Sequence, residues 1–287
     1  MRSFLQLGLA MIAVSTAAPA YAAVLVVDCA TGPFFTINGA VGAAANGDTI
    51  AVHPCIYNEN VVISGFDDLH LVAARRPAGG LVGLTGAMPV GVGVANTSTV
   101  IIDGTGLPGA GIHIDNSRDV SVTGFYVRRC ASNGIEVLGS FNTVIVNNRL
   151  ERNVFAGYFE AQVFDGRFAG NYVFRNGQFG VYLEGTQRLT VQDNRIVFNA
   201  GDGVLVAGDR IQVVNNDVQS NGQHGIHVRF GNENRVERNT SINNNLSGLG
   251  TPNLIVQPGV NLTDVIGNNT AASLVNLGVG TDIAENQ

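Results

Sequence analysis

The sequence predicts an all-β solenoid, a single-stranded parallel β-helix in which each repeat forms one coil. Three observations predict it. Glycines recur every 22 or 23 residues through the middle of the chain, two asparagine columns keep the same spacing, and the apolar residues between them alternate with a period of two. A fixed period made of short alternating runs is typical of stacked β-coils, and each repeat is too short for a pair of helices.

The polar columns mark the corners of the predicted coils. They are Gly111, Gly134, Gly157, Gly180, Gly203, Gly225 and Gly248; Asn148, Asn171, Asn194, Asn216 and Asn239; and Asn153, Asn176, Asn199, Asn221 and Asn244. We expect asparagine at corners because it tolerates the left-handed backbone region and because stacked amides bond to one another. Cys130 continues the last column, so we expect a small buried residue there and not a nucleophile.

Three apolar columns should fill the core. They are Ile112, Ile135, Tyr158, Val181, Val204, Ile226 and Leu249; Val122, Ile145, Phe168, Val191, Val213 and Val236; and Val127, Leu150, Val173, Ile196 and Val218. Successive coils stack at roughly 4.8 Å, so like side chains touch like. Burial of these columns should supply the main stabilisation.

The flanking segments predict how the solenoid begins and ends. Residues 36–46 predict an amphipathic helix with Thr36 as its N-cap, which would cover the open N-terminal end of the core. We assign residues 23–270 to the β-helix domain, with regular coils from about 99 to 250, and residues 271–287 to a C-terminal cap or tail. The stretch from Arg75 to Asn96 is rich in Gly, Pro and Ala and should form a loop.

The first 22 residues predict an export signal. Arg2 precedes an apolar stretch from Leu5 to Val14, and Ala20-Tyr21-Ala22 is a small-x-small cleavage site. We therefore expect a secreted or periplasmic protein that begins at Ala23 after cleavage. No later apolar run in the sequence is long enough to span a bilayer.

The composition limits the kinds of ligand and cofactor that we expect. The net charge of −6 argues against nucleic acid, and all 16 basic residues are arginines, which excludes a catalytic lysine but suits bidentate capture of carboxylates. Export permits a disulfide, and we expect Cys29 to pair with Cys55, leaving Cys130 free. The sequence contains no familiar metal-binding motif, so we expect no metal and no cofactor. We expect a monomer.

One stretch resembles a known superfamily. Residues 36–61 read TINGAVGAAANGDTIAVHPCIYNENV. This run resembles the opening of right-handed parallel β-helix proteins of the pectin-lyase-like superfamily, with Pro54-Cys55-Ile56 in place of the usual Pro-Gly before the tyrosine. The repeats from Gly111 onward resemble the same superfamily. The resemblance implies a right-handed coil, but it leaves activity open because this superfamily hosts lyases, hydrolases, esterases, epimerases and non-enzymes.

The outward positions of the coils carry the first candidate binding surface. Phe159 and Tyr182 should lie on adjacent coils, with Glu184 beside them. An exposed aromatic pair next to a carboxylate is a good floor for a sugar ring. A face covered by a loop or a neighbouring molecule explains the pattern equally well.

A column of arginines forms the second candidate. Arg129, Arg152 and Arg175 recur at a spacing of 23 residues, one per coil. Like charges in line repel, so an acidic polysaccharide along them would be stabilising through Arg–carboxylate contacts. The simpler explanation is a solvated corner with its side chains fanned out.

The third candidate combines Asp202 with His224, which lies one coil later. Gly201-Asp202-Gly203 and His224-Gly225 resemble two fragments of the polygalacturonase pattern. That family needs further acids that are missing here, so the resemblance does not support a hydrolase. Tyr182, His224 or His227 could instead serve as a base, while Arg175 or Arg229 neutralises a uronate carboxylate.

Two functions remain open from the sequence. The first is a secreted enzyme that acts on an acidic, uronate-containing polysaccharide by β-elimination or epimerisation, which need a base and a carboxylate neutraliser. The second is a non-catalytic glycan-binding protein or a surface or periplasmic scaffold. The fold-level resemblance favours the first, and the missing hydrolase and esterase motifs favour the second.

Overall fold

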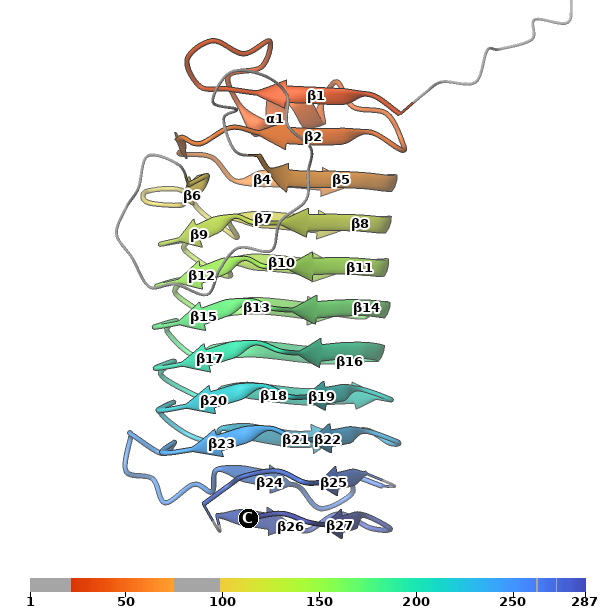
Figure 1. Cartoon of the computed structure of the whole chain (residues 1–287), viewed down its shortest axis with the longest axis vertical. Helices are drawn as coiled ribbons and strands as arrows, with labels where there is room; N and C mark the ends of the chain where they lie inside the picture. Colours follow the sequence, from red (N-terminus) through yellow and green to blue (C-terminus); the bar gives the residue numbers. More distant parts are fainter. Residues whose placement is uncertain (1–21, 75–98, 262, 272) are drawn as a thin grey trace, which may run out of the picture.

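The computed structural model describes residues 22–74, 99–261, 263–271 and 273–287, and these form a parallel β-helix of stacked coils (Figure 1). The predicted export signal at residues 1–22 and the predicted loop at 75–96 lie outside the described residues, apart from residue 22. Every strand pairing is parallel, and most coils add one strand to each of three strips along the solenoid. Among the described residues, no helix is long and apolar enough to cross a membrane.

Each strip is a ladder of short strands. The first strip is β4 (Val61–Ser64), β7 (Ile112–Asp115), β10 (Ile135–Leu138), β13 (Ala156–Ala161), the first half of β16 (Phe179–Gln192), β18 (Val204–Asp209), β21 (Ile226–Phe230), β24 (Leu254–Val256) and β26 (Leu274–Asn276). The second strip is β1 (Val24–Val27), β2 (Thr49–Val52), β5 (Asp67–Ala73), β8 (Arg118–Thr123), β11 (Phe141–Val146), β14 (Phe164–Ala169), the second half of β16, β19 (Gln212–Val214), β22 (Arg235–Glu237), β25 (Asp264–Ile266) and β27 (Asp282–Ala284). The third strip is β3 (Ile56–Tyr57), β6 (Ile101–Asp103), β9 (Tyr126–Arg128), β12 (Arg149–Glu151), β15 (Tyr172–Phe174), β17 (Arg195–Val197), β20 (Asp217–Gln219) and β23 (Thr240–Ile242). Because β16 runs through both the first and second strips, those two form one sheet, and the third strip forms a second sheet.

The three predicted apolar columns line the interior, which confirms the inner face. Ile196, for example, is completely buried between Val173 and Val218 on the neighbouring coils. One predicted member is wrong. Leu249 is 67% exposed, and Leu254 pairs with Ile226 in its place. The segment between β23 and β24 is longer than a repeat allows, so counting 23 residues onward from Ile226 misses the next strand.

Two asparagine ladders run through the corners, as predicted, but only one of the two expected reasons holds. The Asn194 amide donates to the side-chain oxygen of Asn216 at 2.9 Å and to the Phe168 carbonyl at 2.9 Å. The Asn194 side-chain oxygen accepts from the backbone N–H of Asn171 at 2.8 Å. The left-handed conformation belongs instead to the preceding residue of each corner, such as Asp193 with φ 55°. The buried asparagine therefore satisfies backbone groups at the corner, and its neighbour makes the turn.

The interior contains one polar interruption that the sequence analysis did not identify. Tyr158 and Glu160 point inward from β13, both are completely buried, and the Tyr158 hydroxyl donates to the Glu160 carboxylate. Among the described residues, Glu160 Oε1 has no hydrogen-bond partner. Burial raises the pKa of Glu160 to about 7, against the opposing effect of the hydrogen bond from Tyr158. A carboxyl group therefore sits in the core and favours its neutral form there.

The N-terminal end is covered by a helix, α1 (Ile37–Val41), which is shorter than the predicted 36–46. Thr36 is its N-cap, as predicted, and its hydroxyl accepts from the Gly39 N–H. The Glu59 carboxylate also accepts from the first two helical N–H groups, at 2.7 and 2.9 Å. The buried side chains of α1, Ile37, Ala40 and Val41, pack on the core. Figure 1 shows α1 at the end of the stack beside β1 and β2.

The cysteines and the C-terminal end complete the fold. Cys29 and Cys55 form the predicted disulfide, and Cys130 is free and buried. Burial raises the pKa of the Cys130 thiol to about 12, which argues against a nucleophilic role. Residues 271–287, expected to cap the solenoid or form a tail, include β26 and β27, which pair with β24 and β25.

Candidate functional site

The outer face of the first strip carries a column of side chains that changes at every coil. Register pairs His113 with Glu136, Glu136 with Phe159, Phe159 with Tyr182, Tyr182 with Leu205 and Leu205 with His227. The strand period of two that buries their neighbours presents these side chains outward. Polar, aromatic and imidazole groups therefore share one line along the solenoid.

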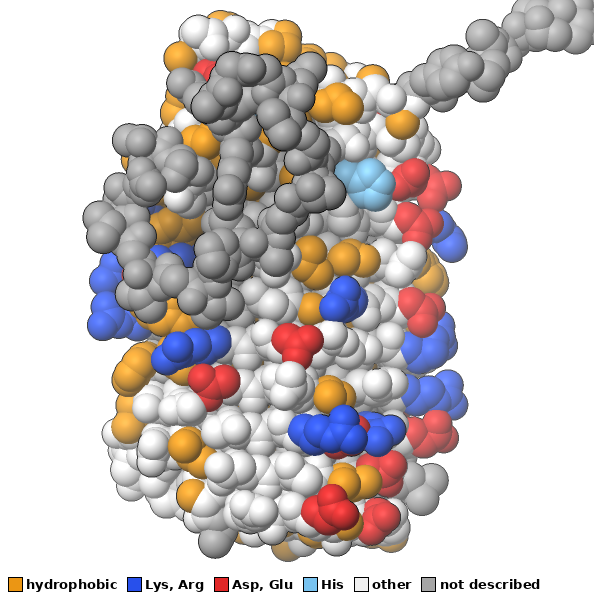
Figure 2. Space-filling model, viewed as in Figure 1, with side chains coloured by type: hydrophobic (Ala, Val, Ile, Leu, Met, Phe, Trp, Pro, Cys, Tyr) orange, Lys and Arg blue, Asp and Glu red, His pale blue; other side chains and the backbone are white. Residues whose placement is uncertain are grey.

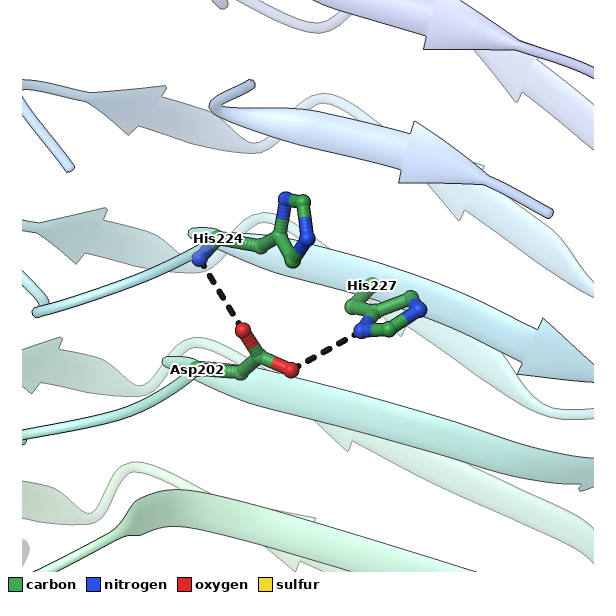
Figure 3. A group of neighbouring side chains, drawn as sticks. All are labelled: Asp202, His224 and His227. Carbon is green, nitrogen blue, oxygen red and sulfur yellow. Dashed lines mark hydrogen bonds and ion pairs between the residues drawn. The ribbon is translucent and has the colours of Figure 1, made fainter. Parts of the chain in front are cut away.

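Asp202, His224 and His227 converge at one end of this line (Figure 3). Asp202 lies in the corner before β18, and both histidines come from the next coil. The Asp202 carboxylate accepts from the backbone N–H of His224 at 2.9 Å and from Nδ1 of His227 at 2.9 Å. The two imidazole rings are 4.7 Å apart between centroids. The structure thus brings together three of the four predicted catalytic residues.

The hydrogen bonds fix the tautomers of both histidines. A carboxylate can only accept, so Nδ1 of His227 carries the proton and Nε2 presents its lone pair. Figure 3 shows Nε2 on the side of the ring away from Asp202. This atom is buried and has no hydrogen-bond partner among the described residues. Nδ1 of His224 likewise donates to the Pro252 carbonyl at 3.0 Å, and burial lowers the pKa of His224, against the opposing charge of Asp202.

This arrangement suits proton abstraction. A buried carboxylate that holds the Nδ1–H of an imidazole keeps Nε2 basic and stabilises the imidazolium that forms when Nε2 takes a proton. The Asp202 side chain is only 4% exposed and that of His227 only 12%, so little water competes for this hydrogen bond. His227 is therefore the best-placed base of the three predicted candidates.

The same three side chains could hold a metal ion. Each offers one ligand atom, and these atoms lie within 4.8 Å of one another. Neutral imidazole and carboxylate are suitable ligands for zinc and related ions. The absence of metal motifs in the sequence does not exclude such a site, because its ligands come from two coils.

Aromatic rings form a cluster on the two coils before that of Asp202, along the same face. The predicted pair, Phe159 and Tyr182, lies 5.2 Å apart between ring centroids. Phe155 and Phe179 join it, with Phe179 5.0 Å from Tyr182 and 5.5 Å from Phe155. These four half-buried rings make a broader apolar floor than predicted. Phe155 and Phe179 were not predicted, because Phe155 lies in the corner before β13 and Phe179 is the first residue of β16, outside the alternating run that follows each glycine.

The surroundings of Tyr182 do not suit the role of base that was predicted for it. Its hydroxyl donates to the Glu184 carboxylate at 2.9 Å. Burial and the hydrogen bond to Glu184 raise the pKa of Tyr182, while the positive charge of Arg229 opposes the rise. Tyr182 therefore stays protonated near neutral pH, so it is not available as a base there and has a proton to donate. Arg229 is near enough to act on Tyr182 and is the extra residue of a bulge in β21.

The arginine column lies elsewhere. Arg129, Arg152 and Arg175 directly follow β9, β12 and β15 of the third strip, and each has a φ near 55°. They are therefore the left-handed corner residues of the second sheet, whereas Tyr182 and His227 lie on the first sheet. The structure separates these arginines from the residues that converge on Asp202, and only Arg229 of the predicted arginines lies with Tyr182.

A family model described as the right-handed β-helix region matches residues 84–218 and 167–281. The chain belongs to this family. No curated protein matches the sequence.

Solved structures resemble this β-helix protein at low sequence identity. An alginate lyase from Paenibacillus sp. str. FPU-7 superposes with a TM-score of 0.63 over 92% of this chain and 98% of its own, at 10% identity. Pectate lyase Pel9A gives a TM-score of 0.58 over 91% of this chain and 76% of its own, at 13% identity. The periplasmic alginate epimerase AlgG gives 0.54 at 12% identity, and the alignment spans 91% of this chain but only 55% of the epimerase. At these identities the likeness shows the fold alone.

Proposed function

We propose that this β-helix protein is exported and acts on an acidic, uronate-containing polysaccharide along the outer face of its first strip, by lyase- or epimerase-type chemistry. The observation that carries the proposal is the Asp202–His227 pair, in which the buried Nε2 of His227 has no hydrogen-bond partner among the described residues, on the same strip of strands as the aromatic cluster. The similar structures include an alginate lyase, a pectate lyase and an alginate epimerase, which supports a polysaccharide as the substrate class.

Both reactions begin with the same step. The base removes the proton on the carbon next to the uronate carboxylate, and the negative charge that develops spreads onto that carboxylate. His227 Nε2 takes the proton, and Asp202 stabilises the resulting imidazolium. Arg229 stabilises the charged carboxylate, and the Tyr182 hydroxyl donates a proton, to the leaving oxygen in elimination or back to carbon in epimerisation. Phe159 and its neighbouring rings support the sugar chain.

The experiment is a panel of polymannuronate, polyguluronate and polygalacturonate. Elimination is followed by the absorbance of unsaturated products, and epimerisation by NMR of the polymer. Asp202→Asn and His227→Gln should each lower kcat roughly a hundredfold or more, the scale of a lost general base. His113→Gln is the matched control, since His113 lies on the same column and bonds Glu136 at 2.8 Å but is far from Asp202 in register.

Two outcomes would change the assignment. Binding of a polyuronate with no product from the parent protein would favour the non-catalytic glycan-binding function. Activity that is lost on chelation and restored by added Zn²⁺ would assign Asp202, His224 and His227 to a metal site instead of a proton-transfer pair.

A further inference from the structure

The outer face of the third strip carries arginines and aromatic rings that alternate from coil to coil. Register places Tyr126, Arg149, Tyr172 and Arg195 opposite one another in turn. The Arg149 guanidinium lies 4.5 Å from the centroid of the Tyr126 ring and 4.9 Å from that of Phe174. Tyr172 and Phe174 stack at 4.7 Å. We call this surface the arginine face, and its arginines are Arg128, Arg129, Arg149, Arg152, Arg175 and Arg195.

On this face, buried carboxylates lie beneath exposed guanidinium groups. Asp103 is shared by Arg128 and Arg129, and Glu151 is shared by Arg149 and Arg152. The Asp103 and Glu151 side chains are only 8% and 3% exposed, whereas those of Arg129 and Arg152 are 47% and 55% exposed. The carboxylates therefore lie beneath, and the guanidinium groups face the solvent.

The face carries more positive charge than it balances. Five of its six arginines are paired with three carboxylates, the third being Asp217 at 3.7 Å from Arg195. Among the described residues, Arg175 has the Phe174 ring as its neighbour, at 5.7 Å, and no carboxylate. This excess lies on a chain whose net charge is −6. Figure 2 shows basic side chains gathered along the left margin, beside the rungs that Figure 1 labels β9 to β17.

We propose that the arginine face anchors a polyuronate chain, at a site separate from the groups that converge on Asp202. Arginine binds carboxylates through two parallel N–H donors, and the partly exposed rings of Tyr126 and Tyr172 can pack on the apolar faces of sugars. Side chains repeated on every coil suit a polymer that runs along the solenoid, where one contact raises the local concentration for the next. The identity of the polymer rests on the proposed function, but the binding itself does not.

The test uses the full mature chain and three polymers: polymannuronate, uncharged dextran and dextran sulfate. The double variant Arg152→Asn and Arg175→Asn removes two exposed guanidinium groups and leaves Glu151 paired with Arg149. Asparagine suits the left-handed backbone at both positions, and Asn243 already occupies the same column with φ 56°. We expect the affinity for polymannuronate to fall roughly tenfold or more, with a weaker salt dependence.

The matched control is Arg188→Asn with Arg210→Asn. These arginines are also exposed and left-handed, with φ 59° and 56°, but they pair with Asp165 and Glu233 along the corner between the first and second strips. Figure 2 shows acidic and basic side chains intermingled along the right margin, where this corner lies. The control variant should bind polymannuronate as the parent does.

Three results would overturn the anchoring site: equal affinity of the Arg152/Arg175 variant and the parent, an equal loss in the Arg188/Arg210 control, or equal affinity of the parent for dextran sulfate and polymannuronate. The last would indicate attraction by bare charge without recognition of the uronate. Failure of the proposed reaction is distinguishable, because Asp202→Asn should slow product formation roughly a hundredfold or more and leave polymannuronate binding unchanged.

Discussion

Inward and outward residues alternate along the strands of the first strip, and the two sets behave differently from coil to coil. Val181, Val204 and Ile226 point inward on successive coils, and all are completely buried aliphatic residues. Their outward neighbours share no chemical property, since Tyr182 and His227 are polar and partly exposed whereas Leu205 is apolar and only 2% exposed. The inner set can repeat because every coil meets the same environment above and below. The outer set has no such constraint, so its differences can serve binding and catalysis.

The largest effect should come from changing an inward residue, here one on the third strip. Ile196→Asp places a carboxylate between Val173 and Val218 with no partner, and it should cost about 5 kcal/mol or more of unfolding free energy. Thermal unfolding and the yield of folded protein measure this. Gln212→Asp, on the exposed side of β19, should change stability by less than about 0.5 kcal/mol. An unchanged melting curve for Ile196→Asp would contradict the inner face.

A substitution in the asparagine ladder should give the second largest loss of stability. Asn194→Ala removes the acceptor of the Asn171 N–H and the donor to the Phe168 carbonyl, and both groups are buried. Two unsatisfied backbone groups should cost roughly 4 kcal/mol. Gln192→Ala, at a partly exposed position of the same coil, is the control in denaturant unfolding. Equal midpoints for the two variants would show that the ladder does not stabilise the corner.

The columns were predictable because regular stacking leaves its period in the sequence. The fold class, the inner face, the strands, the disulfide and the helix cap follow from that period and from local signals. Leu249 was misplaced for the same reason, since a longer segment before β24 breaks the count. The period predicts which residues share a column, but it does not predict which other side chains surround that column in the folded protein.

The candidate site was harder to predict because it depends on side-chain geometry between coils. Asp202 and His227 are 25 residues apart, and only the turn before β18 brings the carboxylate to Nδ1. The arginine column and Tyr182 both point outward, yet their placement on different sheets depends on the corners between them. Glu160 had a usable signal, a charged residue aligned between Val137 and Leu183, which are both buried.

Glu160 is a carboxyl group in an otherwise aliphatic column, so it should make the stability of the protein depend on pH. Its pKa in the folded protein is about 7, above the ordinary 4.5. Between these values the unfolded chain loses the proton while the folded protein keeps it, so the contribution of Glu160 to stability should be greatest below pH 4.5 and fall by about 3 kcal/mol as pH rises through 7. Denaturant unfolding across this range measures the slope.

Glu160→Gln removes the titrating group while keeping its shape. The variant should lose this part of the pH dependence and should be more stable than the parent above pH 7. Glu184→Gln, on the exposed side of β16, is the control and should keep the slope. Parallel pH profiles for Glu160→Gln and the parent would show that Glu160 is not the group responsible.

The smallest effect on stability should come from the outer set, where a change should affect binding instead. Phe159→Leu removes one ring of the aromatic cluster and should cost about 1 kcal/mol of stability. Under the proposed function, the affinity for polyuronate should fall roughly fivefold to tenfold, measured by calorimetry. Phe164→Leu is the control, because Phe164 stacks on Phe141 at 5.2 Å on the second strip and lies outside the cluster. If both variants lose affinity equally, or neither does, the aromatic cluster is not the floor of the binding site. A loss confined to Phe159→Leu would show that residues on one strand divide their roles, with inward side chains holding the coil and outward ones holding the sugar.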